Sequence, residues 1–225
     1  MSDSSAISIV LPAKPIYASK TRLADALSVY ERGALCLILL DGVLQALSEV
    51  TTPHKTIVYG GDPYIRYLCR KHSVTWRRDP GTELNSTLEI AAMEQYSAGA
   101  KAVMLLPTDL GTIDRKGVEC IFTLSHNLDS IILVGSENDG GTNAILCPKG
   151  LFLHPLFGDN SFTNHLNLAY FNKMPVKIPP VSSLSFDVDT PADLEKYFLN
   201  KPSGLKSLEI LAYNLSNHPT ARPGG

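Results

Sequence analysis

The chain has 225 residues, a formal net charge of −2 at pH 7, 44% hydrophobic residues and 19% charged residues. This composition is that of an ordinary globular protein with one well-buried core. The near-neutral charge argues against broad binding to nucleic acid or to a membrane surface. The longest strongly apolar run, residues 34–40, is too short to span a bilayer, and no secretory signal is evident. We therefore expect a cytoplasmic protein with no nucleic-acid or membrane partner.

The four cysteines, Cys36, Cys69, Cys120 and Cys147, are widely spaced and form no C-x-x-C pair. Zinc sites and disulfide frameworks are recognised by close or regular cysteine spacing, which this chain lacks. We expect reduced, mostly buried thiols.

Segments with strand and helix patterns alternate from residue 6 to about residue 199. The first strand, residues 6–11, is rich in β-branched residues and is expected to end at Pro12. A long helix follows over residues 29–50, with Ser28 as its N-cap and Glu31 completing a capping box. The other expected strands are 55–59, 74–77, 102–106, 130–134, 143–147 and 176–179. The other expected helices are 63–71, 85–95, 114–125 and 205–215, with two more starting near Ser161 and Pro191.

This alternation predicts one three-layer α/β domain with a mostly parallel, Rossmann-like sheet. We place the domain at residues 1–200, and a C-terminal helix with a flexible tail at residues 201–225. The carboxyl ends of parallel strands share one edge of such a sheet, and ligands bind there.

The segment AVMLLPTDLG, residues 102–111, places an acidic residue at that edge. Five apolar residues without polar alternation are typical of a strand buried on both faces, and Pro107 should end it. Asp109 follows two residues later, where it can bind a cation. It is explained equally well as a cap of the next turn.

A basic loop follows the first strand, with Lys14, Lys20 and Arg22 within nine residues. Nucleotide-binding α/β domains hold phosphates at this position. The loop lacks a glycine-rich fingerprint, so the phosphates of a triphosphate would be held by side-chain charge. A solvated basic loop is the alternative.

Two further acids, Asp187 and Asp189, lie on the same face of the chain if it is extended there. The adjoining Thr190 and Pro191 are accounted for as the start of a helix. The helix start does not account for the two neighbouring carboxylates, because like charges side by side destabilise each other unless water or a cation relieves them. Mg²⁺ suits such a site, since it prefers one or two protein carboxylates completed by water and substrate oxygens.

Small and polar residues mark two more turns. Gly140 and Gly141 precede Thr142, and allow either a close backbone approach to a ligand or a plain hairpin turn. Gly158 and Ser161 stand at a helix entrance, where backbone N–H groups can bind an anion. We interpret the nearby His165 as a hydrogen-bonded, partly buried side chain rather than a catalyst.

Taken together, these segments resemble the 2-phospho-L-lactate guanylyltransferases of coenzyme F-420 biosynthesis and their relatives that use phosphoenolpyruvate or 3-phosphoglycerate. The resemblance spans residue 7 to about residue 199. It rests on LPAKPIYASKTRL (11–23), ERGAL (31–35), LPTDL (106–110), DGGTNAIL (139–146), FGDNSFTNH (157–165) and DVDTPADL (187–194).

The resemblance implies a nucleotidyltransferase fold like that of nucleotide-diphospho-sugar transferases, and it implies a role for each matching residue. Mg²⁺, as two ions with GTP, would be held by Asp109, Asp187 and Asp189. The nucleotide would be bound by Pro12, Lys14, Lys20, Arg22, Asp79 and Asn85. The phosphorylated acid would be bound by Gly141, Thr142, Gly158 and Ser161.

Two positions depart from the family pattern. Gly111 stands where the family usually has proline, and residues 83–88 read ELNSTL in place of the usual GLNAAL.

The implied reaction joins GTP to a small phosphorylated acid and releases pyrophosphate, with Asp109, Lys14, Lys20 and Arg22 as the catalytic groups. Catalysis would consist of positioning and charge neutralisation. A downstream phospho-acid transferase would use the product, and a homodimer is left open. The alternatives are another nucleotidyltransferase or DxD glycosyltransferase of this fold, or a non-catalytic nucleotide-binding protein.

Overall fold

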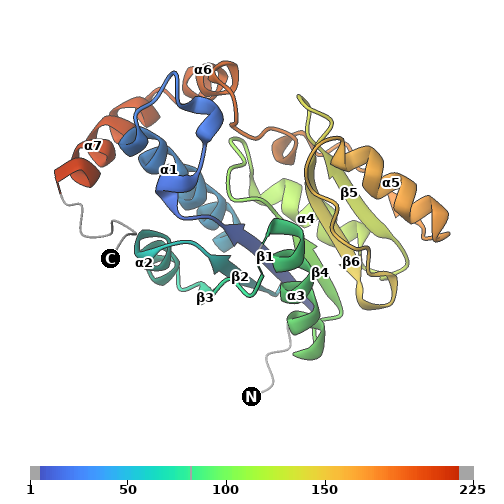
Figure 1. Cartoon of the computed structure of the whole chain (residues 1–225). Coiled ribbons are helices and arrows are strands. Elements are labelled where there is room, and N and C mark those ends of the chain that lie inside the picture. Colours follow the sequence, from blue (N-terminus) through green and yellow to red (C-terminus); the bar gives the residue numbers. More distant parts are fainter. Residues whose placement is uncertain (1–5, 82, 218–225) are drawn as a thin grey trace.

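The computed structural model describes residues 6–81 and 83–217 (Figure 1). A seven-stranded sheet runs through it in the order β3-β2-β1-β4-β6-β5-β7. The strands are β1 (Ile7–Ala13), β2 (His54–Gly60), β3 (Thr75–Arg77), β4 (Ala102–Leu105), β5 (Ile131–Gly135), β6 (Thr142–Pro148) and β7 (Val176–Lys177).

Six of the seven strands point the same way, which confirms the expected mostly parallel sheet. β6 runs antiparallel to both of its neighbours, β4 and β5. It follows β5 through the glycine turn, so the hairpin interpretation of Gly140 and Gly141 is correct. Because β6 is reversed, its first residue, Thr142, lies at the edge where the other strands end.

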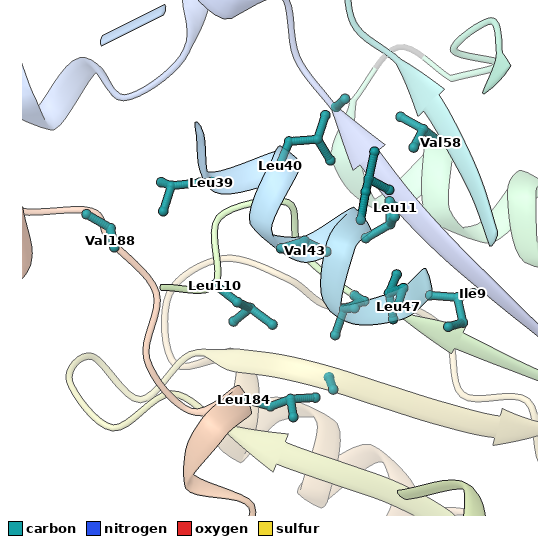
Figure 2. Packing of buried hydrophobic residues seen from close by; sticks show 14 of the residues in the cluster. Ile9, Leu11, Leu39, Leu40, Val43, Leu47, Val58, Leu110, Leu184 and Val188 are labelled. Carbon is teal, nitrogen blue, oxygen red and sulfur yellow. The ribbon is translucent and has the colours of Figure 1, made fainter. Parts of the chain in front are cut away.

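Helices cover both faces of the sheet and make three layers (Figure 1). Side chains alternate along the strands: Ile9 and Leu11 pack toward α1, whereas Val10 packs toward α3. Figure 2 shows the first of these interfaces, between β1 and α1. The helices are α1 (Val29–Ser48), α2 (Pro63–Lys71), α3 (Leu84–Ser97), α4 (Arg115–Leu124), α5 (Ser161–Phe171), α6 (Pro191–Asn200) and α7 (Ser203–Asn217).

The helix starts follow their capping residues. The Ser28 hydroxyl accepts from the backbone N–H of Glu31, whose carboxylate accepts from the N–H of Ser28, so the predicted capping box is confirmed. Thr190 and Asp193 form a second capping box at α6. These local hydrogen bonds explain why the expected bounds of the helices agree closely with the observed ones.

The sequence suggested that the first strand ends at Pro12, but the structure shows that it does not. β1 continues to Ala13, and Pro12 pairs with Tyr59 of β2. The carbonyl of Val10 faces β4, since it accepts from the N–H of Leu106. In a strand, the backbone N–H and carbonyl groups of residues two apart point to the same side. An N–H at position 12 would therefore point toward β4, which has already ended there.

The C-terminal helix is part of the core. α7 buries Leu208, Ala212 and Leu215 in the same cluster as α1. It therefore extends the domain beyond residue 200 instead of lying outside it. The flexible tail that we expected falls on residues 218–225, outside the described residues.

All four cysteines are free, but they are less buried than expected: Cys69 and Cys147 are buried, Cys36 is half-buried and Cys120 is exposed. In the part of the chain that the structure describes, no helix is both long and apolar enough to cross a membrane.

Leu47 offers a direct test of the α1 interface. Its side chain is 1% exposed and lies in the cluster of Figure 2. Leu47→Ala leaves a cavity, and we expect it to lower the free energy of unfolding by about 2–5 kcal/mol in urea titrations. The control is Gln45→Ala on the exposed face of α1, which should change it by less than about 0.5 kcal/mol. Equal effects of the two variants would contradict this packing.

Candidate active site

A cavity of about 510 Å³ opens at the carboxyl edge of the sheet. Its walls come from the end of β1 and the loop after it, the start of α3, and the segment after β4. The lining residues are Pro12, Ala13, Lys14, Ala18, Ser19, Lys20, Thr21, Cys36, Leu40, Tyr59, Ile65, Asp79, Glu83, Leu84, Thr87, Pro107, Thr108, Asp109 and Asp189.

Lys20 joins the two acidic segments at the floor of this cavity. Its Nζ lies 2.6 Å from Oδ2 of Asp109 and 2.7 Å from Oδ1 of Asp189. The Lys20 side chain is 5% exposed, and its backbone is left-handed with φ +54° between two short 3-10 turns. Burial alone would lower the pKa of the ammonium, but the two carboxylates outweigh burial and raise it.

Backbone pairing brings the acids together from positions far apart in the chain. Leu110 forms an isolated antiparallel bridge with Asp187, and the N–H of Gly111 donates to the carbonyl of Phe186 over 2.9 Å. Phe186 and Val188 are buried in the core, so the alternating Asp187 and Asp189 share the other face. The predicted common face is thus confirmed.

Gly111, one of the two departures from the family pattern, is required by this pairing. A Cβ at this position would lie 2.8 Å from Cε1 of Phe186, closer than real side-chain contacts allow. A proline here would also lose the hydrogen bond that Gly111 donates to Phe186.

Asp187 has different partners from the other two acids. Its Oδ1 accepts hydrogen bonds from Ser136 (3.0 Å) and from Asn143 (3.2 Å). Burial, and then the charge of Asp109, raise the pKa of Asp187, while the hydrogen bond from Asn143 opposes the rise. Sequence reasoning missed Ser136, since a serine after a strand carries no distinctive signal.

The expected metal site is incomplete in this conformation. Across residues 6–81 and 83–217, no three His, Cys, Asp or Glu side chains are grouped so as to hold a metal ion. Lys20 supplies the positive charge between Asp109 and Asp189. The donor chemistry still fits Mg²⁺, because both of these carboxylates are partly exposed to the cavity and two carboxylates are what a hydrated, phosphate-bound ion requires.

The remaining predicted phosphate-binding cations lie at the same cavity. Lys14 and Pro12 line it. Arg22 does not line it, but lies close by, with Nη1 3.9 Å from Oδ2 of Asp189 and a side chain 65% exposed. Lys20 and Arg22 thus lie at Asp189, and Lys14 lies elsewhere in the cavity wall.

Asp79 and the start of α3 form another part of the cavity wall. Oδ1 of Asp79 accepts from the N–H of Gly81 (3.0 Å) and from the hydroxyl of Thr87. Thr87 lines the cavity, whereas Asn85 does not. The side-chain atoms Oδ1 and Nδ2 of Asn85 instead form hydrogen bonds with the backbone of Phe157. The structure thus does not bring Asn85 to the predicted nucleotide position.

The four predicted acid-binding residues lie together, beside the cavity and not in its wall. The N–H of Thr142 donates to Oγ of Ser161 (2.8 Å), and the N–H of Ser161 donates to the carbonyl of Gly158 (3.2 Å). Gly141 precedes Thr142 in the turn. The next residue, Asn143, bonds to Asp187 and so connects this cluster to the acids.

We expect Gly111→Ala to disturb the segment that carries Asp187. The added Cβ must displace the Phe186 ring, which should cost about 1–3 kcal/mol in the free energy of unfolding, and Gly111→Pro should cost more. Urea titration measures both. The matched control is Gly150→Ala, whose Cβ would meet no atom within 4 Å. If Gly111→Ala is as stable as this control, the backbone at position 111 does not lie as close to the Phe186 ring as described.

A second expectation concerns His165, which is fully buried. Burial lowers the pKa of His165 to about 4. The unfolded chain, with a histidine pKa of about 6.5, therefore takes up the proton first as the pH falls. The native protein should lose up to about 3 kcal/mol of stability from this group between about pH 6.5 and pH 4.

The comparison that isolates this effect is the difference in unfolding free energy between the native chain and His165→Gln, which cannot titrate. That difference should shrink as the pH is lowered through the same range. A difference that stays constant with pH would show that His165 does not titrate below its ordinary value.

Residues 7–215 match the family model described as "Guanylyl transferase CofC like". A phosphoenolpyruvate guanylyltransferase of Sphaerobacter thermophilus is 31% identical over 200 residues, covering 89% of this chain and 96% of the relative. A 2-phospho-L-lactate guanylyltransferase of Methanobrevibacter smithii is 28% identical over 186 residues, covering 82% and 80%.

Among solved structures, a putative nucleotide-diphospho-sugar transferase from Desulfovibrio desulfuricans G20 superposes with a TM-score of 0.74. The two chains are 16% identical, and the match covers 93% of this chain and 98% of the other. At that identity the likeness establishes the fold, which is the nucleotidyltransferase-like α/β fold that the sequence predicted.

Proposed function

Because the chain belongs to the CofC-like guanylyl transferase family, we propose that it transfers a guanylyl group from GTP to a small phosphorylated acid in coenzyme F-420 biosynthesis. The acceptor is phosphoenolpyruvate, 2-phospho-L-lactate or 3-phosphoglycerate. The products are a GDP-linked acid and pyrophosphate. The observation that carries the proposal is the contact of Lys20 with Asp109 and Asp189 in a cavity at the carboxyl edge of the sheet.

The cavity suits a nucleoside triphosphate along its length. Asp79 and Thr87 in the cavity wall would face the base and ribose, and the cations Lys14 and Lys20 in the wall, with Arg22 beside it, would hold the phosphates. Side-chain cations are needed because the loop after β1 has no glycine-rich cradle.

The chemistry needs no protein nucleophile. A phosphate oxygen of the acceptor, already anionic near neutral pH, attacks the α-phosphorus of GTP. The bond from that phosphorus to the bridging oxygen of the β-phosphate breaks, and pyrophosphate leaves with the electron pair. The protein's part is to align the two anions and to offset their charge.

The three aspartates and the cluster proposed to bind the phosphorylated acid have separate roles in this alignment. Asp109 and Asp189, with Asp187 beside them, would hold Mg²⁺, which neutralises phosphate charge when bound. The helix entrance at Gly158 and Ser161, with Thr142, would hold the carboxylate and phosphate of the acceptor. Asn143 bonds to Asp187 and so fixes one site against the other.

The test supplies the purified protein with GTP, Mg²⁺ and each of the three acids, alone and in competition. Pyrophosphate release and mass spectrometry of the products are measured. We expect release only when an acid is present, together with a GDP-linked acid whose mass identifies the acceptor. A coupled downstream phospho-acid transferase traps a product that decays.

Asp109→Asn should lower turnover on the order of 10²–10³-fold, because it removes a charge that organises the reacting phosphates. Asp129→Asn is the control, since Asp129 pairs with Lys177 on the surface, away from the cavity. No pyrophosphate with any of the acids would overturn the proposal. Transfer from a nucleotide sugar would instead favour a glycosyltransferase of this fold.

A further inference from the structure

The loop that precedes α5 is held at two neighbouring residues, Leu156 and Phe157. Oδ1 of Asn85 accepts from the N–H of Phe157 (2.8 Å), and Nδ2 of Asn85 donates to the carbonyl of the same residue (3.1 Å). The neighbouring N–H, that of Leu156, donates to Nε2 of His165 (2.8 Å). Asn85 belongs to α3 and His165 to α5, so the backbone of Leu156 and Phe157 connects the two helices.

The bond to Leu156 fixes the protonation pattern of His165. A backbone N–H can only donate, so Nε2 must be the acceptor and the ring proton of the neutral histidine lies on Nδ1. Nδ1 is 3.0 Å from Oγ1 of Thr142 and therefore donates to it. Burial, which lowers the pKa of His165, keeps the ring in this neutral form.

This pattern determines what the Thr142 hydroxyl can do. Its oxygen accepts from His165, which leaves its own proton for another acceptor. The backbone N–H of Thr142 is held by Ser161, so the residue is fixed at both its hydroxyl and its main chain. The Phe157 ring packs edge-on against His165, with 5.2 Å between ring centroids.

We propose that Asn85 and His165 are positioning residues for the phosphorylated acid. Asn85 holds the backbone N–H and carbonyl of Phe157, and with them the position of Gly158 and Ser161 at the entrance of α5. His165 orients the Thr142 hydroxyl so that it donates to an anionic oxygen of the acid. This inference rests on the proposed function.

The position of Asn85 in α3 gives the network a second consequence. Thr87, two residues further on, bonds to Asp79 in the wall of the cavity proposed for the nucleotide. The first turn of α3 therefore contacts the nucleotide cavity through one residue and the acid-binding loop through another. Removing the Asn85 amide group should loosen the acid side while Thr87 and Asp79 keep the nucleotide side in place.

The experiment compares Asn85→Ala with Asn172→Ala in steady-state assays with GTP and phosphoenolpyruvate. Asn172 donates one exposed hydrogen bond at the end of α5 and is the matched control. Asn85→Ala loses two hydrogen bonds, so we expect the KM for the acid to rise roughly tenfold. The KM for GTP should change less than about twofold, and the control should match the native protein in both.

A purely structural role for Asn85 would leave both KM values unchanged or shift them together, and either result overturns the inference. If Asn85→Ala does not fold, His165→Gln serves instead. The glutamine amide reaches the place of Nε2, where its oxygen can accept from Leu156, but it has no donor at the place of Nδ1, which contacts Thr142. The KM for the acid should therefore again rise alone. If the native protein makes no product with any acid, the proposed function itself fails, and the inference fails with it.

Discussion

The mutual repulsion of three carboxylates is the constraint on which the functional edge of this protein depends. Asp109, Asp187 and Asp189 converge where the strands end, and each needs compensation. Lys20 compensates two of them directly, from a left-handed backbone position that turns its side chain under the cavity. Asp187 is stabilised by hydrogen bonds from Ser136 and Asn143. Such an arrangement is stable without a ligand, yet it is well suited to accept a cation together with anionic phosphates.

The fold creates this convergence through two backbone features. The first is the pairing of residues 109–111 with residues 186–188, which requires the absence of a side chain at Gly111. The second is the reversal of β6, which carries Thr142 and Asn143 back to the edge where the parallel strands end. Neither feature places a group in the cavity by itself. Together they set the cluster of Thr142 and Ser161 next to the carboxylates, through the bond of Asn143 to Asp187.

Most of the individual residues in the site were recognisable in the sequence, because their signals are local. A buried strand, a proline and then an aspartate predict an acid at a sheet edge, and the alternation of Asp187 and Asp189 predicts their common face. The errors arose where the partner lies far along the chain. Pro12 continues β1 because β4 stops early beside it. Asn85 bonds to Phe157, 72 residues away, and Ser136 bonds to Asp187, 51 residues away.

The sequence alone therefore determined the fold class, the helix caps, the acidic and basic segments and the resemblance to a guanylyltransferase family. These depend on hydrophobic period, on hydrogen bonds between near neighbours and on the order of motifs. Only the tertiary structure decided that Lys20 bridges two of the acids, that Gly111 is needed for close packing, and that Asn85 and His165 hold the backbone of Phe157 and Leu156. Those outcomes depend on distances between segments remote in the chain, and the packing of the whole core sets these distances.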